Sequence, residues 1–207
     1  PFIDMENFIT IYNEVDHMNG KLNSWEYYYN NVSNFTLNEI YNSQNVIISA
    51  NKISKGMVHN IHENSEFKSL YKENIFFNDQ TKLILEKTIN QFELKESKIL
   101  GVHFRGTSYK RSPRHPLPAT INQMIKFTDN LLNKHSFEKI FLVTEEKRYL
   151  EKFEKIYGSK LLYINSYRSN KDDAFLKYNR PFHRYNLGLE SIIESYILSK
   201  CLGILYV

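Results

Sequence analysis

Short apolar runs alternate with amphipathic segments through the second half of the chain. The apolar runs predict strands over 99–104, 140–143, 161–164 and 203–207. The segments between them, whose apolar residues recur at helical spacing, predict helices over 120–132, 147–157 and 188–200. Strands that alternate with helices form parallel sheets through right-handed crossovers, so the pattern predicts a Rossmann-like α/β unit.

The first half of the chain has weaker periodicity. Residues 1–34 are rich in Asn, Tyr and Phe without a clear repeat and are predicted to be irregular. A short helix begun by Thr36 is predicted over 36–41, and a short strand over 46–49. The first strongly periodic helix is predicted over 80–95, with an apolar side formed by Leu83, Ile84, Ile89 and Phe92.

Composition places the chain among folded domains. Its 207 residues are 42% hydrophobic and 24% charged, which excludes disorder and collagen-like repeats. The single cysteine, Cys201, excludes a disulfide framework and favours a reducing compartment, so a cytoplasmic location is expected. We find no leader pattern and no apolar run of membrane-spanning length, and the start at Pro1 suggests a fragment.

Charge divides the chain into two unequal parts. Residues 1–95 contain 8 Lys and no Arg against 12 Asp and Glu, a balance of −4. Residues 96–207 contain 19 basic and 11 acidic residues, a balance of +8, and every arginine lies beyond residue 100. This asymmetry indicates that the second part handles an anion.

The loop after the first predicted strand carries the densest positive charge. In open parallel sheets ligands bind outside the carboxyl ends of the strands, and Arg105 lies at such an end. Its planar guanidinium can hold two phosphate oxygens, and Gly106 lets the backbone approach a ligand. The same strand end and loop also contain His103, Thr107, Lys110, Arg111, Arg114 and His115. The alternative is a solvated basic loop with no ligand.

Acidic residues occur at two further places in the unit. Glu145 and Glu146 follow Thr144 at the second strand end, where they could bind a nucleotide or simply begin the next helix. Glu194 lies on the last helix, where it could face a ligand or be exposed to solvent. Before that helix, Asn186 and Gly188 could direct free N–H groups toward a phosphate.

Several common site chemistries are missing from the sequence. It contains no glycine-rich phosphate loop and no Cys/His metal spacing, and Asp172-Asp173 lacks a strand-end context. A bound diphosphate would therefore be neutralised by basic side chains and a helix end, and neither a metal nor a separate cofactor is expected.

Taken together, these motifs resemble the donor-binding domain of the GDP-fucose-dependent fucosyltransferases. This superfamily includes α-1,2 and α-1,6 enzymes, the nodulation-factor enzyme and the protein O-fucosyltransferases. The similarity covers about 97–207 and is carried by His103-Phe104-Arg105-Gly106-Thr107, His115-Pro116, Phe141-Leu142-Val143-Thr144-Glu145-Glu146 and Gly188 through Leu198-Ser199-Lys200-Cys201.

The resemblance implies a metal-independent, inverting glycosyltransferase of GT-B type. Residues 1–95 would be a partial, mainly helical or irregular acceptor-side segment, and 96–207 a Rossmann-like donor domain truncated at its C-terminus. The donor would be GDP-fucose or a related GDP-sugar, and the acceptor a bacterial surface glycan. The implied donor-binding residues are His103, Arg105, Gly106, Thr107, Thr144, Glu145 and Glu194. Arg105 would hold the diphosphate, and Glu194 is favoured for recognising guanine.

Departures from the family pattern leave the general base unassigned. Gly106 stands where many members have a second arginine, and Ser108 where many have Asp. His115 is the candidate for the general base and is expected, together with Arg105, to be catalytic. Asp4 and Glu26 are the alternative candidates for the base.

Other functions remain open on the sequence alone. They are a transferase for another nucleotide sugar on the same fold and a non-catalytic nucleotide or glycan-binding module. Nucleic-acid binding is disfavoured because the basic residues cluster at strand ends rather than along one face. Peripheral association with the inner face of a membrane is kept as an expectation. The aromatic cluster 25–29 could stack on an acceptor sugar or form part of a core.

Overall fold

The computed structural model describes residues 2–47, 65–92, 98–106, 118–171, 174–175 and 180–206. The chain forms two compact units, Pro1–Lys82 and Leu83–Val207. The division falls inside helix α4 (Asp79–Gln91), earlier than the expected boundary after residue 95. The acceptor-side and donor-side roles of the two parts stay predictions.

The second unit is built on a four-stranded parallel sheet. Its strands are β1 (Ile99–His103), β2 (Lys139–Val143), β3 (Leu161–Leu162) and β4 (Gly203–Tyr206), in the order β3-β2-β1-β4. In the central strand, Leu100 lies opposite Ile140 on one side and Gly203 on the other. The expected α/β fold with a Rossmann-like parallel sheet is confirmed.

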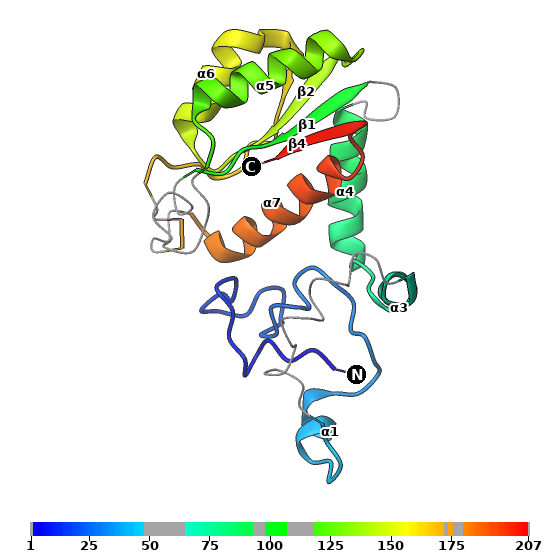
Figure 1. Cartoon of the computed structure of the whole chain (residues 1–207). Helices are drawn as coiled ribbons and strands as arrows, with labels where there is room; N and C mark the ends of the chain where they lie inside the picture. The colour runs from blue at the N-terminus through cyan, green and yellow to red at the C-terminus, as the bar shows by residue number, and fades with distance from the viewer. Residues whose placement is uncertain are drawn as a thin grey trace. The chain divides into compact units, whose positions relative to one another are not determined.

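Helices cover both faces of this sheet (Figure 1). Helices α5 (Ile121–Lys134) and α6 (Lys147–Tyr157) lie on one face, and α7 (His183–Leu198) lies on the other. The core under α5 and α6 consists of Leu100, Val102, Phe104, Met124, Ile140, Leu142, Tyr149, Phe153 and Leu161. Because both faces are buried, the central strands are continuous apolar runs, which is why the sequence predicts them well.

Helix α7 packs very closely on β1. A Cβ at Gly101 would come within 2.8 Å of Leu198 Cδ2 and 3.2 Å of Cys201 Sγ. Gly101 therefore allows the end of α7 to approach the central strand, and a larger residue would force the two elements apart.

Local sequence signals explain the helix starts that were predicted well. Thr36 begins α1 (Leu37–Tyr41) in a capping box with Glu39, and Thr120 begins α5 in the same way with Gln123. These reciprocal side-chain bonds satisfy backbone N–H groups that have no partner inside the helix.

Four elements differ from the sequence predictions. Helix α3 (Ser65–Asn74) was not predicted, because only Phe67, Leu70 and Tyr71 of its ten residues are apolar. Helix α7 begins at His183 rather than at residue 188, and β3 stops at Leu162. The strand predicted over 46–49 is absent at Val46 and Ile47, which are exposed coil, and its remainder lies outside the described residues.

Helix α4 buries a face that overlaps the predicted one only in part, since Ile84, Ile89 and Phe92 are half-buried. Leu83 is 67% exposed, whereas Leu85 is buried together with Thr81. Thr81 and Leu85 are four positions apart and therefore share a face, and this tertiary packing overrides the apolar spacing read from the sequence.

The first unit is mostly irregular, as predicted for 1–34. Two isolated antiparallel bridges, Met18 with Lys21 and Tyr29 with Phe77, are the β-pairing found among its described residues. Buried Asn23 helps to hold this region, because its side chain accepts from the Met5 N–H and donates to the Ile3 carbonyl.

Candidate functional site

The candidate site lies where the strand order reverses. The chain runs from β1 outward to β2 and β3, then returns to β4 on the other side of β1. In open parallel sheets a ligand crevice forms at such a point, outside the carboxyl ends of the strands. His103, the last residue of β1, is flanked there by Val143 of β2 and Tyr206 of β4.

Arg105 and Glu145 follow β1 and β2 at this edge. The Glu145 carboxylate accepts a hydrogen bond from the Gly106 N–H, with 2.8 Å between N and Oε1. The same oxygen lies 4.0 Å from Nε of Arg105. The two side chains are 40% and 31% exposed, respectively. Glu145 thus holds the backbone next to Arg105, and part of the Arg105 side chain remains exposed.

Gly106 is required by the close approach of Glu146. Glu146 is fully buried and occupies the position that begins α6, and its carboxylate is paired with Nε of Arg148. A Cβ at residue 106 would overlap that carboxylate. A side chain at residue 106 would therefore displace the Glu146 carboxylate from this position.

Thr144 and the two glutamates take different parts in this edge. Thr144 is buried, and its Oγ1 accepts the Glu146 N–H at 3.3 Å. Of the two alternatives for the acidic pair, Glu146 begins the helix, while Glu145 turns toward the loop after β1. Donor contacts of Thr144 and Glu145 stay predictions.

The imidazole of His103 is partly buried at this edge. Burial and the nearby Arg105 guanidinium lower the pKa of His103 below its ordinary value of 6.5, against an opposing effect of Glu145. The ring is therefore mainly neutral at pH 7. It adds hydrogen-bonding capacity to the edge, while Arg105 supplies the charge.

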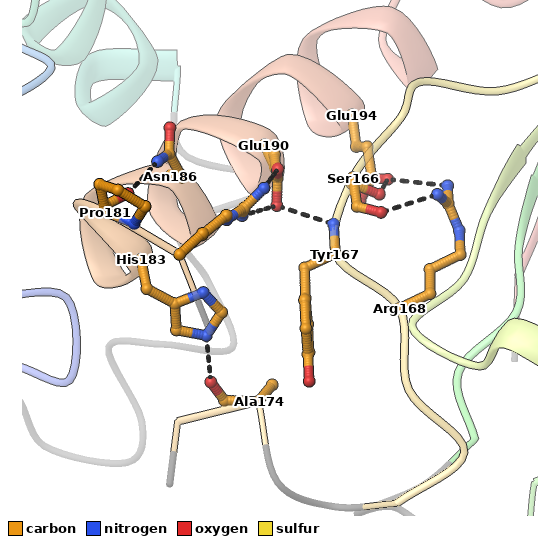
Figure 2. Close-up of polar contacts among 10 residues, drawn as sticks. Ser166, Tyr167, Arg168, Ala174, Pro181, His183, Asn186, Glu190 and Glu194 are labelled. Carbon is orange, nitrogen blue, oxygen red and sulfur yellow. Dashed lines mark hydrogen bonds and ion pairs between the residues drawn. The ribbon is translucent and has the colours of Figure 1, made fainter. Parts of the chain in front are cut away.

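Glu194 is buried rather than exposed on the surface of α7. Ser166 donates a hydrogen bond of 2.7 Å to Glu194 Oε1, and Arg168 Nη2 lies 3.6 Å from the same oxygen (Figure 2). Burial raises the pKa of Glu194 to about 7, although Ser166 and Arg168 act in the opposite direction. The alternative of a solvent-exposed carboxylate is therefore excluded by the packing, and contact with guanine stays a prediction.

Glu190 forms a second tie between α7 and the segment before it (Figure 2). Its two carboxylate oxygens accept bonds of 2.7 and 2.8 Å from Arg180. It also accepts the Tyr167 N–H at 3.1 Å. Glu190 and Glu194 together attach the chain that follows β3 to one helix, which places residues 166–168 near the carboxyl edge of the sheet.

The predicted phosphate site at Asn186 and Gly188 is wrong. The Asn186 N–H is already bonded to the Phe182 carbonyl at 2.9 Å, and Gly188 lies buried inside α7. The helix starts earlier, at His183, whose ring is fully buried and 2.7 Å from the Ala174 carbonyl. Because a carbonyl only accepts, Nε2 of His183 carries the proton.

Part of the predicted site cannot be placed. Thr107 and His115, together with Ser108, Lys110, Arg111 and Arg114, lie outside the described residues, as do Asp172 and Asp173. The catalytic role given to His115 and the donor contact given to Thr107 therefore stay predictions.

The two alternative bases of the first unit differ in their surroundings. Burial alone would raise the pKa of Asp4, but hydrogen bonds from Tyr41 and Asn7 outweigh it, so the pKa is lowered and the carboxylate is a weaker base. Glu26 instead pairs with Lys21 at 2.8 Å and lines a cleft.

Metal-ligand clusters and membrane-spanning helices are both missing from the described ranges. Within them, no three or more His, Cys, Asp or Glu side chains come together as metal ligands. No helix in the same ranges has the length and apolar character needed to cross a membrane.

Comparison with solved structures finds distant likenesses among fucosyltransferases. NodZ α-1,6-fucosyltransferase co-crystallized with GDP is 15% identical with a TM-score of 0.49, over 69% of this chain and 42% of that one. Fucosyltransferase NodZ from Bradyrhizobium is 16% identical with a TM-score of 0.47, over 68% and 42%. The chain thus spans less than half the length of these enzymes. No family model matches the sequence, and no curated protein is similar to it in sequence.

Sequence reasoning missed the partners that hold the glutamates of α7. Ser166, Arg168 and Arg180 lie in a segment without periodicity, and each meets its glutamate only after the chain has turned back on itself. The sequence signal was that all arginines belong to the second half, and this did not distinguish the arginines that hold α7 from Arg105 at the end of β1.

Proposed function

We propose that the chain carries the donor-binding part of a glycosyltransferase that uses a nucleotide sugar. The observation that supports this most directly is the partly exposed Arg105 at the reversal point of the sheet, next to backbone held by Glu145. The sequence resemblance implies that the complete enzyme has a GT-B fold, that its donor is GDP-fucose and that its acceptor is a bacterial surface glycan. A cytoplasmic location belongs to the same proposal.

The proposed chemistry is an inverting transfer. An acceptor hydroxyl attacks the anomeric carbon of the sugar, the bond from that carbon to the diphosphate oxygen breaks, and the diphosphate leaves with the electron pair. The proton of the hydroxyl passes to a base, for which His115 is the candidate. Arg105 would stabilise the charge that develops on the diphosphate, a role that needs a fixed guanidinium at the strand end.

Glu194 is proposed to accept hydrogen bonds from guanine. This requires the ionised carboxylate, and Arg168 favours that form while burial opposes it. Because the pKa of Glu194 is about 7, the affinity for GDP should weaken as the pH falls below about 7. An affinity for GDP that is constant from pH 8 to pH 6 would remove Glu194 from the guanine site.

Nucleotide selectivity tests the proposal. Thermal unfolding is followed with GDP, GDP-fucose, UDP, CDP and ADP, and the GDP compounds should raise Tm while the others do not. Arg105→Ala should abolish the shift, and Arg105→Lys should restore only part of it because lysine keeps the charge but loses the planar fork. Equal responses to all nucleotides would refute a GDP-sugar site, and a response to UDP would favour another nucleotide sugar.

Catalysis is distinguished from binding by product release. A transferase should liberate GDP from GDP-fucose, faster with a suitable glycan acceptor and undetectably in Arg105→Ala. Binding of GDP-fucose without turnover under every acceptor condition would instead support the non-catalytic module.

A further inference from the structure

The cleft that Glu26 lines lies among residues of the first unit. Its volume is about 390 Å³, within the range of small-molecule sites. The described residues that line it are Met18, Asn19, Lys21, Glu26, Tyr27, Tyr29, Asn30, Asn31, Asn78 and Gln80. The donor chemistry proposed above uses none of them.

A tight turn forms one rim of this cleft. Met18 and Lys21 exchange two backbone hydrogen bonds of 2.9 and 3.0 Å across the turn. The residues between them, Asn19 and Gly20, both have positive φ, 53° and 76°, as a two-residue hairpin turn of the primed type requires. The Asn19 amide then donates to Gln80 Oε1 at 3.0 Å, which fixes the rim to the start of α4.

Backbone contacts through Asn78 make the opposite wall rigid. Its side-chain amide donates to the carbonyls of Glu26 and Tyr27 at 3.1 and 3.0 Å, and its own N–H donates to the Tyr28 carbonyl at 3.0 Å. The wall is therefore in place before any ligand arrives, which lowers the entropic cost of binding.

The aromatic residues of the wall form a packed stack. The ring of Tyr29 is stacked on Trp25, with centroids 4.4 Å apart, and on Phe77, with centroids 5.1 Å apart. Tyr27 and Tyr28 are buried beside them. The aromatic cluster 25–29 therefore forms part of a core, one of the two alternatives left open by the sequence. Because both faces of the Tyr29 ring are covered, Tyr29 presents its edge to the cleft.

The polar groups of the lining balance in charge and mix donors with acceptors. Lys21 Nζ is paired with Glu26 Oε2 at 2.8 Å, so the two charges cancel. The side-chain amides of Asn30 and Asn31 make no hydrogen bond to other described residues, and each offers both a donor and an acceptor. A phosphate would find no net positive charge here, and a base would find no open aromatic face.

We propose that this cleft binds a neutral saccharide through its hydroxyl groups. Neighbouring hydroxyls of a sugar each donate and accept, which matches amides and a carboxylate held on a rigid frame. Binding of the sugar does not depend on the donor site. Its assignment as the acceptor rests on the transferase function proposed above.

Side-chain amide resonances provide a direct test. The uniformly 15N-labelled 207-residue chain is titrated with the methyl glycosides of glucose, galactose, mannose, fucose and N-acetylglucosamine at millimolar concentrations. At least one glycoside should shift the amide signals of Asn30, Asn31 and Gln80 in a saturable way. The signal of Asn34, an exposed asparagine outside the lining, should stay in place.

Matched variants locate the binding. Asn31→Ala and Glu26→Gln should each weaken the glycoside by roughly 3- to 10-fold, the effect of one lost hydrogen bond. Asn34→Ala is the control and should bind as the parent chain does. Because Asn31 is exposed and makes no hydrogen bond within the described residues, its removal should leave Tm unchanged.

Two results would overturn the proposal. One is the absence of any saturable shift across the five glycosides. The other is binding that survives unchanged in both Asn31→Ala and Glu26→Gln. The stabilisation by GDP is measured on the same variants and should persist in all of them, so failure of this cleft and failure of the donor site are distinguished.

Discussion

The second unit uses arginine–glutamate pairs in two contrasting ways. Arg168 is buried, with 5% of its side chain exposed, and meets Glu194, which is 14% exposed. Arg105 is 40% exposed and lies 4.0 Å from a partner that is itself partly open, Glu145. The residue types are the same, but the surroundings differ.

Burial decides what each pair can do. A buried pair has lost its hydration, so removing one partner leaves an uncompensated charge, and the pair acts as a fixed tie. An open pair is screened by water and contributes little to stability, so its arginine can exchange a weak partner for a phosphate. The contrast predicts large stability effects at the buried pair and small ones at the open pair.

Removing the buried arginine should have the largest effect. At pH 8, where Glu194 is mainly ionised, Arg168→Met should lower the free energy of unfolding by about 3–5 kcal/mol because the carboxylate is left buried without its cation. Urea denaturation measures the change. The double variant Arg168→Met/Glu194→Met should regain most of the loss, and an equal loss in both variants would contradict the role of the charge.

The packing of Gly106 against Glu146 gives the next largest effect. Gly106→Ala should cost about 1–3 kcal/mol of unfolding free energy because the added methyl group overlaps the carboxylate. The same denaturation experiment measures it. Adding Glu146→Ala should remove the clash and make the substitution at residue 106 nearly neutral in that background, and no such rescue would show that the contact is not the cause.

Acid stability should report the buried glutamate. Since the pKa of Glu194 rises from 4.5 to about 7 on folding, its stabilising contribution is full below pH 4.5 and falls as the pH rises to about 7. Glu194→Gln should remove this fall, so the difference between the Tm values of the two proteins should change by about 7–14 °C across the window. Parallel curves would mean that Glu194 does not titrate there. The lowered pKa of His103 changes stability with pH in the opposite direction, and this effect is the same in the parent protein and in Glu194→Gln.

The open pair should show the smallest effect on stability. Arg105→Ala should change the unfolding free energy by no more than about 0.5 kcal/mol, as exposed pairs do. The same variant should lose its response to GDP. A loss of several kcal/mol without ligand would place Arg105 with the structural arginines and end the contrast.

Local patterns predicted the sheet and most of its helices. Strands buried on both faces leave apolar runs, and Thr120 with Gln123 marks a helix start within four residues, so both signals can be read without knowing the fold. The carboxyl-edge residues Arg105 and Glu145 followed from the same periodicity, because a strand end fixes where the next residue lies.

Non-local packing explains what the sequence did not predict. Ser166 reaches Glu194 and Tyr167 reaches Glu190 only through the return of the chain onto α7, and these contacts accompany the start of that helix at His183. The close approach of Glu146 to Gly106 likewise joins two strand ends that are far apart along the chain.

The central position of β1 also affects the order in which the sheet can assemble. Leu100 pairs with Ile140 and with Gly203, so one side of this strand is closed early along the chain and the other only by β4, the last strand of the described residues. During synthesis β1, β2 and β3 can pair before β4 has been made, and one edge of β1 then has no neighbouring strand. Chaperone binding to nascent chains should therefore peak before β4 emerges and fall once it has paired.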